Sequence, residues 1–199
     1  MTVPAPVNPY AGLPPLKWAA VTQQLIARHP LSVNELKLVT LSSWASIFNS
    51  SFAGFKIGTQ IKPKPQMMAF FLSELIALEF ERRYPGVWRP DQVATDKDMV
   101  FIRDLGYSVE IKASSNPTQV FGNRSYAQPG GTTGKKGKSG YYLTVNFQKF
   151  TSGSVPPKIV RIKFGWLDHS DWIAQKSATG QQAHIELEAR RTKLVQIYP

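Results

Sequence analysis

The sequence predicts a single α/β domain. Apolar residues recur at helical spacing between residues 16 and 83, whereas the apolar segments after residue 97 mostly have the length and alternation of strands. The chain has 199 residues, 42% of them hydrophobic, which is enough to bury one sizeable core. We find neither an internal repeat nor a domain boundary. We therefore expect one unit made of an irregular arm (1–15), a helical scaffold (16–65) and a core (66–199).

Three helices are expected in the first part of the chain. Leu16–Arg28 has helical periodicity and ends before Pro30. Ser32-Val-Asn-Glu35 resembles a capping box, which opens a second helix. The side chains expected to pack inward from it are Leu36, Val39, Leu41, Trp44, Ile47 and Phe48. After a Gly-, Pro- and Lys-rich connection at 50–65, Gln66–Arg83 forms the third helix. Its expected apolar face consists of Met67, Phe70, Phe71, Leu75, Ile76 and Leu78.

A β-hairpin is expected next, after a linker at 84–95. Two apolar runs, Met99–Ile102 and Tyr107–Ala113, flank the turn-like segment Arg103-Asp104-Leu105-Gly106. In a hairpin folded about Asp104, residues whose numbers sum to about 208 face each other, and Asp98 and Glu110 satisfy that sum. Lys112 lies two residues beyond Glu110 and so leaves the same face of the strand. Two carboxylates and an amine are thereby gathered within cross-strand reach.

Opposed carboxylates require a positive group between them, and Mg²⁺ prefers oxygen ligands. A lysine beside such an ion can hold a water molecule or neutralise charge on a phosphate. Glu74 lies within the expected apolar face of the third helix, so it has to be paired or linked to the metal. The alternative for this pattern is a surface hairpin with a cross-strand ion pair. Glu79 has Arg82 and Arg83 one turn away and is expected to form a solvated helix ion pair.

The second half of the chain is expected to extend the sheet of this hairpin. Residues 141–150 and 159–167 have strand character, as does the tail at 192–198. Ser170 is expected to cap a short helix at 171–178, which ends before Gly180. Between the strands, residues 129–140 form a basic segment of low complexity, which we expect to become ordered only on a bound polyanion.

The charge balance indicates a polyanionic partner. The formal net charge is +11 with a pI near 9.9, and no Asp or Glu occurs between Lys112 and Asp168. Such an acid-free basic tract after an acidic hairpin is typical of a phosphate-binding surface beside a metal site. The alternative is an incidentally basic surface.

Other classes of site lack support in the sequence. The absence of cysteine excludes disulfides, thiolate zinc sites and a cysteine nucleophile, and it suits a reducing cytoplasm. The first residues lack a basic segment followed by an apolar one, and no apolar run reaches about 20 residues, so we expect no signal peptide and a cytoplasmic protein without membrane association. The three histidines are far apart and are expected to be surface residues or satisfied by hydrogen bonds.

The spacing of Asp98, Glu110 and Lys112 resembles the PD-(D/E)xK nuclease pattern, although Lys97 rather than Pro precedes Asp98. Asp91 follows Pro90 but lies too far along the linker to face Glu110. More specific motifs occur across the chain, among them VEIKASS at 109–115, GNRSYAQ at 122–128, KSGYYLTVNF at 138–147, FGWLDHSDW at 164–172 and ATGQQA at 178–183. Together they resemble the ScaI-type restriction endonucleases of the PD-(D/E)xK superfamily, from about residue 8 to the end of the chain.

The resemblance implies a mixed β-sheet flanked by helices and a Mg²⁺-dependent enzyme that cleaves both strands of a short palindromic DNA site to blunt ends. Asp98, Glu110 and the backbone carbonyl of Ile111 would bind the metal, Lys112 would position the attacking water, and Glu74 would complete the acidic cluster. A homodimer is expected, because each chain has one site and a palindrome has two strands. A DNA methyltransferase is expected as a genetic companion rather than a stable partner. The alternatives are a repair, junction-resolving or mobile-element nuclease, or an inert DNA-binding protein.

Bases are read by bidentate donors and acceptors, which Arg, Asn and Gln supply. The first group of candidates follows the catalytic strand and comprises Asn123, Arg124, Ser125, Tyr126 and Gln128. A second group lies near the expected C-terminal helix and comprises Gln175, Lys176, Thr179, Gln181 and Gln182. Phosphate contacts are expected from Lys135, Lys136 and Lys138. Polar surface or turn capping is the alternative for any one of these residues.

Overall fold

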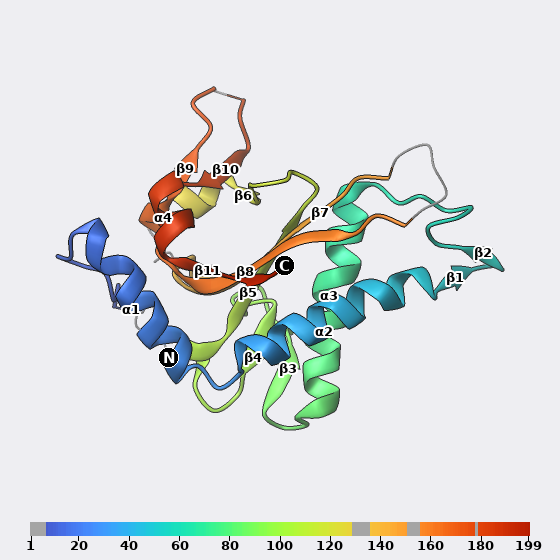
Figure 1. The fold of residues 1–199 in the computed structure, drawn as a ribbon, viewed down its shortest axis with the longest axis horizontal. Coiled ribbons are helices and arrows are strands. Elements are labelled where there is room, and N and C mark those ends of the chain that lie inside the picture. The colour runs from blue at the N-terminus through green and yellow to red at the C-terminus, as the bar shows by residue number, and fades with distance from the viewer. Residues whose placement is uncertain (1–6, 129–135, 151–155, 178) are drawn as a thin grey trace.

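A six-stranded mixed sheet lies at the centre of the molecule, in the strand order β11-β8-β7-β5-β4-β3 (Figure 1). A computed structural model describes residues 7–128, 136–150, 156–177 and 179–199. The strands of this sheet are β3 (Trp88–Pro90), β4 (Met99–Phe101), β5 (Val109–Ser114), β7 (Gly140–Phe147), β8 (Ile159–Leu167) and β11 (Leu194–Tyr198). The expectation of a mixed sheet flanked by helices is confirmed.

The middle of the sheet is β7, every residue of which is buried. It pairs with β5 in parallel and with β8 antiparallel. A strand that is covered on both faces needs apolar residues along most of its length, and its sequence GYYLTVNF meets that need. The strands predicted at 141–150, 159–167 and 192–198 are thus present with shifts of a few residues at their ends.

Alternation along β5 and β7 divides the surroundings of the sheet into two sides. Val109, Ile111, Tyr141 and Leu143 belong to a large core that also contains the buried faces of the first three helices. Tyr142, on the opposite face of β7, belongs to a separate apolar cluster. Because side chains alternate between the faces of a strand, Glu110 and Lys112 lie on the side away from the large core.

The first three helices are α1 (Pro15–Arg28), α2 (Val33–Phe48) and α3 (Pro65–Arg83), close to the predicted bounds. The Ser32 hydroxyl accepts a hydrogen bond from the Glu35 amide at 3.2 Å, as a capping box requires. The Glu35 carboxylate instead accepts a hydrogen bond from the Tyr84 hydroxyl, so only half of the predicted box forms. The inward positions of α2 are confirmed, with four of the six predicted residues buried and the other two, Leu41 and Phe48, packed against the same core.

The predicted face of α3 is confirmed for Phe71, Leu75 and Ile76, which pack against the large core, and wrong for its other three residues. The buried positions are Met68, Leu72, Ile76, Ala77 and Phe80, whereas Met67, Phe70 and Leu78 are about half exposed. Of the predicted face, only Ile76 is fully buried. Apolar side chains surround most of this helix, so its periodicity does not select one face.

Three connections differ from the sequence-based expectation. The segment 50–65 contains a two-stranded ribbon, β1 (Ser51–Phe52) with β2 (Phe55–Lys56). The linker 84–95 contributes the edge strand β3. The turn of the main hairpin is longer than predicted, because β4 ends at Phe101 and the one-turn 3₁₀ helix η1 (Leu105–Tyr107) precedes β5.

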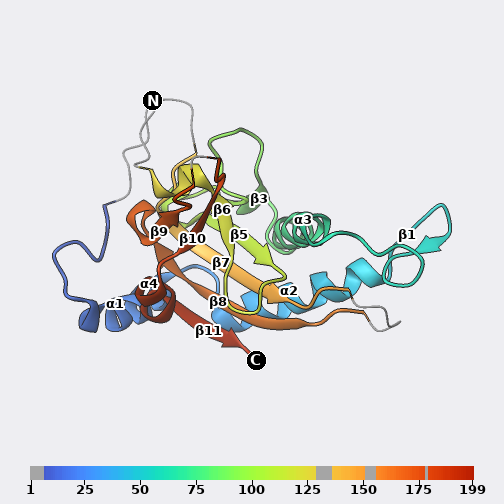
Figure 2. The same ribbon diagram turned by 90° about the horizontal axis from the view of Figure 1, so that it is seen from above.

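A three-stranded sheet with the order β6-β10-β9 packs beside the main one. It consists of β6 (Phe121–Asn123), β9 (Trp172–Ala174) and β10 (Gln182–Ile185), and the 3₁₀ helix η2 (Arg124–Ala127) directly follows β6. Figure 2 shows β5 between α3 and this small sheet.

The helix predicted at 171–178 is not formed by the residues that the structure describes there. Instead, the 3₁₀ turn η3 (His169–Asp171) leads into β9, whose Ala174 pairs with Ala183 of β10. Asp168, not Ser170, caps the turn. Trp172 is buried and Ile173 is exposed, which is the alternation of a strand, and pairing with β10 therefore prevails over the helical signal.

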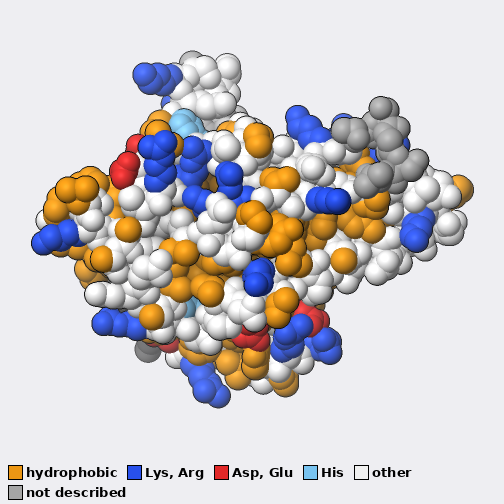
Figure 3. All heavy atoms as spheres, in the orientation of Figure 1, with side chains coloured by type: hydrophobic (Ala, Val, Ile, Leu, Met, Phe, Trp, Pro, Cys, Tyr) orange, Lys and Arg blue, Asp and Glu red, His pale blue; other side chains and the backbone are white. Residues whose placement is uncertain are grey.

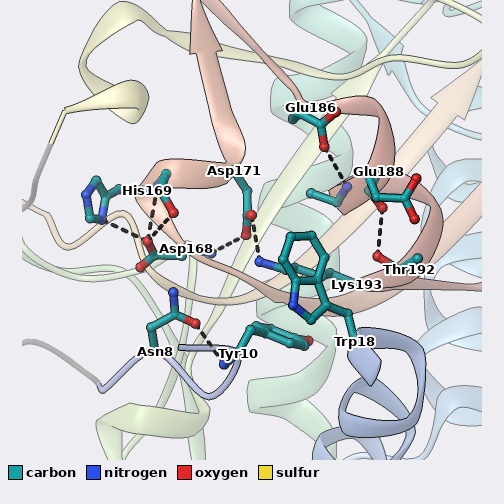
Figure 4. A network of polar contacts seen from close by, with 12 residues as sticks. Asn8, Tyr10, Trp18, Asp168, His169, Asp171, Glu186, Glu188, Thr192 and Lys193 are labelled. Atoms are coloured by element: carbon teal, nitrogen blue, oxygen red, sulfur yellow. Dashed lines mark hydrogen bonds and ion pairs between the residues drawn. The ribbon is translucent and has the colours of Figure 1, made fainter. Parts of the chain in front are cut away.

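A buried lysine near the C-terminus, Lys193, contacts both η3 and the N-terminal part of the chain (Figure 4). Lys193 follows α4 (Leu187–Thr192), and its Nζ donates to Asp171 Oδ1 at 2.7 Å. The same ammonium lies 4.0 Å from the ring centre of Trp18 and 4.3 Å from that of Tyr10. The charge of Lys193 is thus paired and also placed against two aromatic faces, which stabilises it in a site that is 2% exposed. Among the described residues, no helix has the length and apolar character needed to cross a membrane.

Candidate active site

The hairpin brings Asp98, Glu110 and Lys112 together. Met99 pairs with Val109, which is the register expected from the sum of 208. Lys112 Nζ lies 2.5 Å from Glu110 Oε1 and 3.8 Å from Asp98 Oδ2. Asp98 Oδ2 also accepts a hydrogen bond from the amide of Ile111 at 2.7 Å. The aspartate before β4 is therefore fixed directly to the catalytic candidate strand β5.

A second lysine, Lys136, lies between the two carboxylates. Its Nζ is 2.7 Å from Asp98 Oδ1 and 2.8 Å from Glu110 Oε2. Lys136 was expected to contact phosphate, but in this structure it contacts the acidic pair. One cation therefore already bridges the two carboxylates in the way that a metal ion would.

Burial and neighbouring charges act in opposite directions on the pKa values of Glu110 and Lys112. Burial alone would raise the pKa of Glu110, which is 1% exposed, but the charges of Lys112, Lys97 and Lys136 outweigh burial and hold its pKa below the usual range. Burial lowers the pKa of Lys112, and the neighbouring Glu110 and Asp98 charges more than compensate, so its pKa is raised. Glu110 is thus an anion and Lys112 a cation at neutral pH.

Lys97 is a further member of the cluster that the sequence did not single out as functional. Its Nζ donates to the Gly137 carbonyl at 3.2 Å and lies 5.3 Å from the ring centre of Tyr142. Burial lowers the pKa of Lys97 to about 8, partly offset by the Glu110 carboxylate. The available signal was its position directly before Asp98, where the superfamily pattern has proline.

The donor set fits a divalent cation. Among the described residues, no group of three or more His, Asp or Glu side chains is arranged around a common metal position. Glu110 Oε2, however, is buried, and it contacts a positive charge, Lys136 Nζ, at 2.8 Å. An ionised carboxylate oxygen in that position favours a cation, and hard oxygen donors suit Mg²⁺. Asp98 and Glu110 supply two such donors.

Glu74 and Ile111 lie at the margin of this cluster. Burial raises the pKa of Glu74, and the charges of Asp91 and Asp98 raise it further, which places this helix carboxylate within electrostatic range of the hairpin. In the described part of the chain, the Glu74 carboxylate has no hydrogen-bond or ion-pair partner. Ile111 lines the cleft described next, and the role of its carbonyl stays a prediction.

A cleft of ≈ 900 Å³ opens beside the acidic pair. Its walls are the start of α3, the outer half of β5 and the start of the small sheet, and its lining includes Asp98, Lys112, Phe70, Asn123 and Gln182. Asp98, Lys112 and members of both groups of expected base readers therefore line one cavity, with the buried Glu110 directly behind Lys112.

The first group of expected base readers lies on β6 and η2. Asn123, Ser125 and Gln128 are exposed. Arg124 instead donates through Nη1 to the carbonyls of Ser177 and Gly180, both at 3.2 Å. In this structure the Arg124 side chain therefore supports the β9–β10 turn.

Tyr126 points inward. It is 5% exposed, and its hydroxyl donates to Glu110 Oε1 at 2.5 Å. We expected this side chain to contact DNA, whereas in the structure its hydroxyl group is hydrogen-bonded to the catalytic candidate Glu110. The sequence offered no signal for this contact, because 15 residues separate the two positions in the chain and η2 follows no regular period.

The second group lies around the β9–β10 turn, and not near a helix. Its members are all exposed: Gln175, Lys176, Thr179, Gln181 and Gln182. Two further lysines were expected to contact phosphate. Lys138 Nζ lies over the ring of Tyr126, 4.3 Å from its centre, and Lys135 lies outside the described residues.

The histidine and helix ion-pair predictions are confirmed where the structure addresses them. His29 is buried, with Nε2 3.0 Å from the Tyr107 carbonyl. Glu79 pairs with Arg82 and Arg83, each at 2.7 Å, on the outside of α3.

Comparison with known proteins identifies the family. No solved structure matches the chain. The chain is 46% identical to the type II restriction enzyme ScaI of Streptomyces caespitosus over 193 residues, which cover 96% of this chain and 85% of that enzyme. The family model described as ScaI restriction endonuclease matches residues 8–198. The chain therefore belongs to the ScaI restriction endonuclease family.

Proposed function

We propose that this protein is a type II restriction endonuclease that hydrolyses both strands of DNA at a short palindromic site in the presence of Mg²⁺. The observation that supports it most is the cluster of Asp98, Glu110 and Lys112 at the edge of a cleft lined by polar side chains. Membership of the ScaI family agrees with this chemistry.

In the proposed mechanism, the two carboxylates hold the cation and the lysine acts next to it. A bound Mg²⁺ would activate a water molecule and neutralise charge on the scissile phosphate. Asp98 and Glu110 would fix the position of the ion, since Asp98 Oδ1 and Glu110 Oε2 face the same point. Lys112 would orient the attacking water or stabilise the phosphate as its negative charge grows. Attack on phosphorus with loss of the 3′ oxygen leaves a 5′-phosphate and a 3′-hydroxyl.

The basic surface would bind the DNA backbone. No Asp or Glu occurs between Lys112 and Asp168, and the net charge is +11. Figure 3 shows Lys and Arg side chains gathered near α4. Burial lowers the pKa of Arg190 in this helix, and the nearby charges of Arg161 and Arg191 lower it further. The exposed amides Asn123, Gln181 and Gln182 are proposed as base readers at the cleft, and a two-fold homodimer would place one site on each strand.

Two variants test the assignment. Glu110→Ala and Lys112→Ala should each lower the rate of plasmid cleavage in Mg²⁺ by more than about a thousandfold, a loss typical of central catalytic groups. DNA binding, measured by fluorescence anisotropy in Ca²⁺, should remain detectable. Glu79→Ala is the matched control, because Glu79 is an α3 surface carboxylate paired with two arginines. Cleavage that persists in either active-site variant would remove the assignment.

The specificity is tested by digesting a sequenced plasmid with the wild-type protein and sequencing the ends by run-off. Discrete fragments with paired ends at one palindrome are expected. Random fragments, or cleavage confined to branched DNA, would instead indicate a repair or junction-resolving nuclease. Binding without any cleavage would indicate an inert DNA-binding protein.

A further inference from the structure

One oxygen of Glu110 is fixed by two donors. Oε1 accepts from the Tyr126 hydroxyl and from Lys112 Nζ, each at 2.5 Å. The other oxygen, Oε2, forms an ion pair with Lys136 Nζ at 2.8 Å, on the side where Asp98 Oδ1 also lies. The carboxylate is thereby held in one orientation, with Oε2 directed to the point that it shares with Asp98 Oδ1 and that Lys136 fills in this structure.

We propose that Tyr126 is a positioning residue for catalysis, whose hydroxyl holds Glu110 in the orientation that binds the divalent cation. The inference rests on the proposed nuclease function and adds to it a residue that acts through Glu110. Carboxylates that bind metals are commonly oriented by hydrogen bonds from a further shell of side chains, whose loss costs roughly 10–100-fold in metal affinity or activity.

The ring of Tyr126 is held firmly enough to aim its hydroxyl. Trp172 packs against it with ring centres 4.9 Å apart, and Lys138 lies over one face at 4.3 Å. On another side, a Cβ added to Gly122 would lie 2.8 Å from the ring carbons. Glycine at this position therefore provides the space in which the ring sits, and both residues belong to the same GNRSYAQ motif.

The same short helix also supports part of the proposed recognition surface. In η2, the Arg124 amide donates to the Gln181 carbonyl at 2.7 Å, and the Arg124 side chain donates to the carbonyls of Ser177 and Gly180. Two residues later, Tyr126 holds Glu110. The turn that carries the exposed amides and the carboxylate that would bind the ion are thus fastened to one four-residue element.

Tyr126→Phe tests the proposal, because it keeps the packed ring and removes only the hydroxyl. Isothermal titration with Mn²⁺ in the absence of DNA should show about 10–100-fold weaker binding. In steady-state cleavage at fixed Mg²⁺, kcat should fall by a similar factor with KM for DNA unchanged, and raising Mg²⁺ should recover much of the rate. If Tyr126 served packing alone, Tyr126→Phe would lower the melting temperature but would not lower kcat selectively with KM unchanged.

Tyr141→Phe is the matched control. Tyr141 is also buried, and its hydroxyl donates to the Leu25 carbonyl at 3.1 Å on the other face of the sheet. Both Mn²⁺ affinity and kcat should equal those of the wild type in this variant. Mn²⁺ binding by Tyr126→Phe within twofold of that of Tyr141→Phe would overturn the proposal.

A second variant answers the question if Tyr126→Phe does not fold. Gly122→Ala keeps the hydroxyl but forces the ring to shift, so it too should weaken Mn²⁺ binding, and unchanged binding would overturn the proposal. The metal titration is independent of cleavage. A wild-type protein that binds Mn²⁺ but cuts no specific site would contradict the proposed function and not the role of Tyr126.

Discussion

At the scale of single residues, Lys136 occupies the point at which the proposed divalent ion has to bind. Its Nζ lies within 2.8 Å of oxygens from both Asp98 and Glu110. Burial lowers the pKa of Lys136, but the two carboxylates outweigh burial and raise it, so the side chain stays charged. Ion and ammonium therefore compete for the same oxygens, and Lys136 has to leave before the site can load.

Removing this competitor should strengthen metal binding. We expect Lys136→Gln to bind Mn²⁺ about tenfold more tightly than the wild type in the absence of DNA, which corresponds to roughly 1.4 kcal/mol. Isothermal titration measures the change. Lys149→Gln serves as control, because Lys149 lines the cleft without an ion pair to the described carboxylates. Equal or weaker binding by Lys136→Gln would show that the lysine supports the site rather than blocks it.

The catalytic candidates were predictable from the sequence, whereas their supporting residues were not. Asp98, Glu110 and Lys112 follow from strand arithmetic, since a hairpin register fixes which residues oppose each other. Lys136 and Tyr126 reach the same carboxylates from segments without periodicity, where spacing in the chain says nothing about distance. The placement of Tyr126 required the packing of the small sheet against β5, and that of Lys136 required the path of the chain into β7.

At the scale of elements, the end of α1 is fastened to the hairpin by a neutral histidine. His29 Nδ1 accepts from the Leu31 amide at 3.2 Å, so Nε2 bears the proton and donates to the Tyr107 carbonyl at 3.0 Å. Burial lowers the pKa of His29 to about 4, despite the two backbone contacts. The ring also packs between Tyr141 and Phe164. Protonation would thus place a buried charge at the junction of three elements.

The stability of this junction should depend on pH. The unfolded chain protonates His29 near pH 6.5 and the folded one only near pH 4, so the unfolded state binds more protons between these values. The contribution of neutral His29 to the free energy of unfolding is complete above pH 6.5 and is lost as pH falls towards 4. At pH 4.5 the loss amounts to about 2 kcal/mol. Urea unfolding at pH 7 and 4.5 should show a drop in the free energy of unfolding that is smaller by this amount in His29→Gln. An equal drop in both proteins would contradict the prediction.

Element boundaries were predictable where one face of an element is apolar and the other polar. The faces of α2 and the positions of β7 and β8 illustrate this. In α3, apolar side chains surround the helix, so only contact with α2, β3 and β5 selects the buried face. In 171–178, a capping signal was present, but it opens a single 3₁₀ turn before β9 pairs with β10. Tertiary contacts decided both elements.

At the scale of the whole molecule, the sheet separates stability from chemistry. One side carries the large core with the buried faces of α1, α2 and α3, while the other carries the acidic pair and the small sheet, and the start of α3 also lines the cleft. Each chain has a single set of Asp98, Glu110 and Lys112, and a double-stranded cut requires two hydrolytic events. If each chain of a two-fold dimer cuts one strand, a dimer with one inactive chain should nick DNA.

Mixed dimers test this expectation. Wild-type and Glu110→Ala chains with different affinity tags are coexpressed, and the mixed species is isolated by two successive affinity steps. We expect it to convert supercoiled plasmid to the open-circular form, with the nick at the recognition site, because the inactive chain still binds but leaves its strand intact. A mixed dimer of wild-type and Glu79→Ala chains should give linear product, since Glu79 pairs with arginines away from the cleft. Linear product at the wild-type rate from the Glu110→Ala mixture would mean that one active centre cuts both strands, and the dimer would then serve recognition alone.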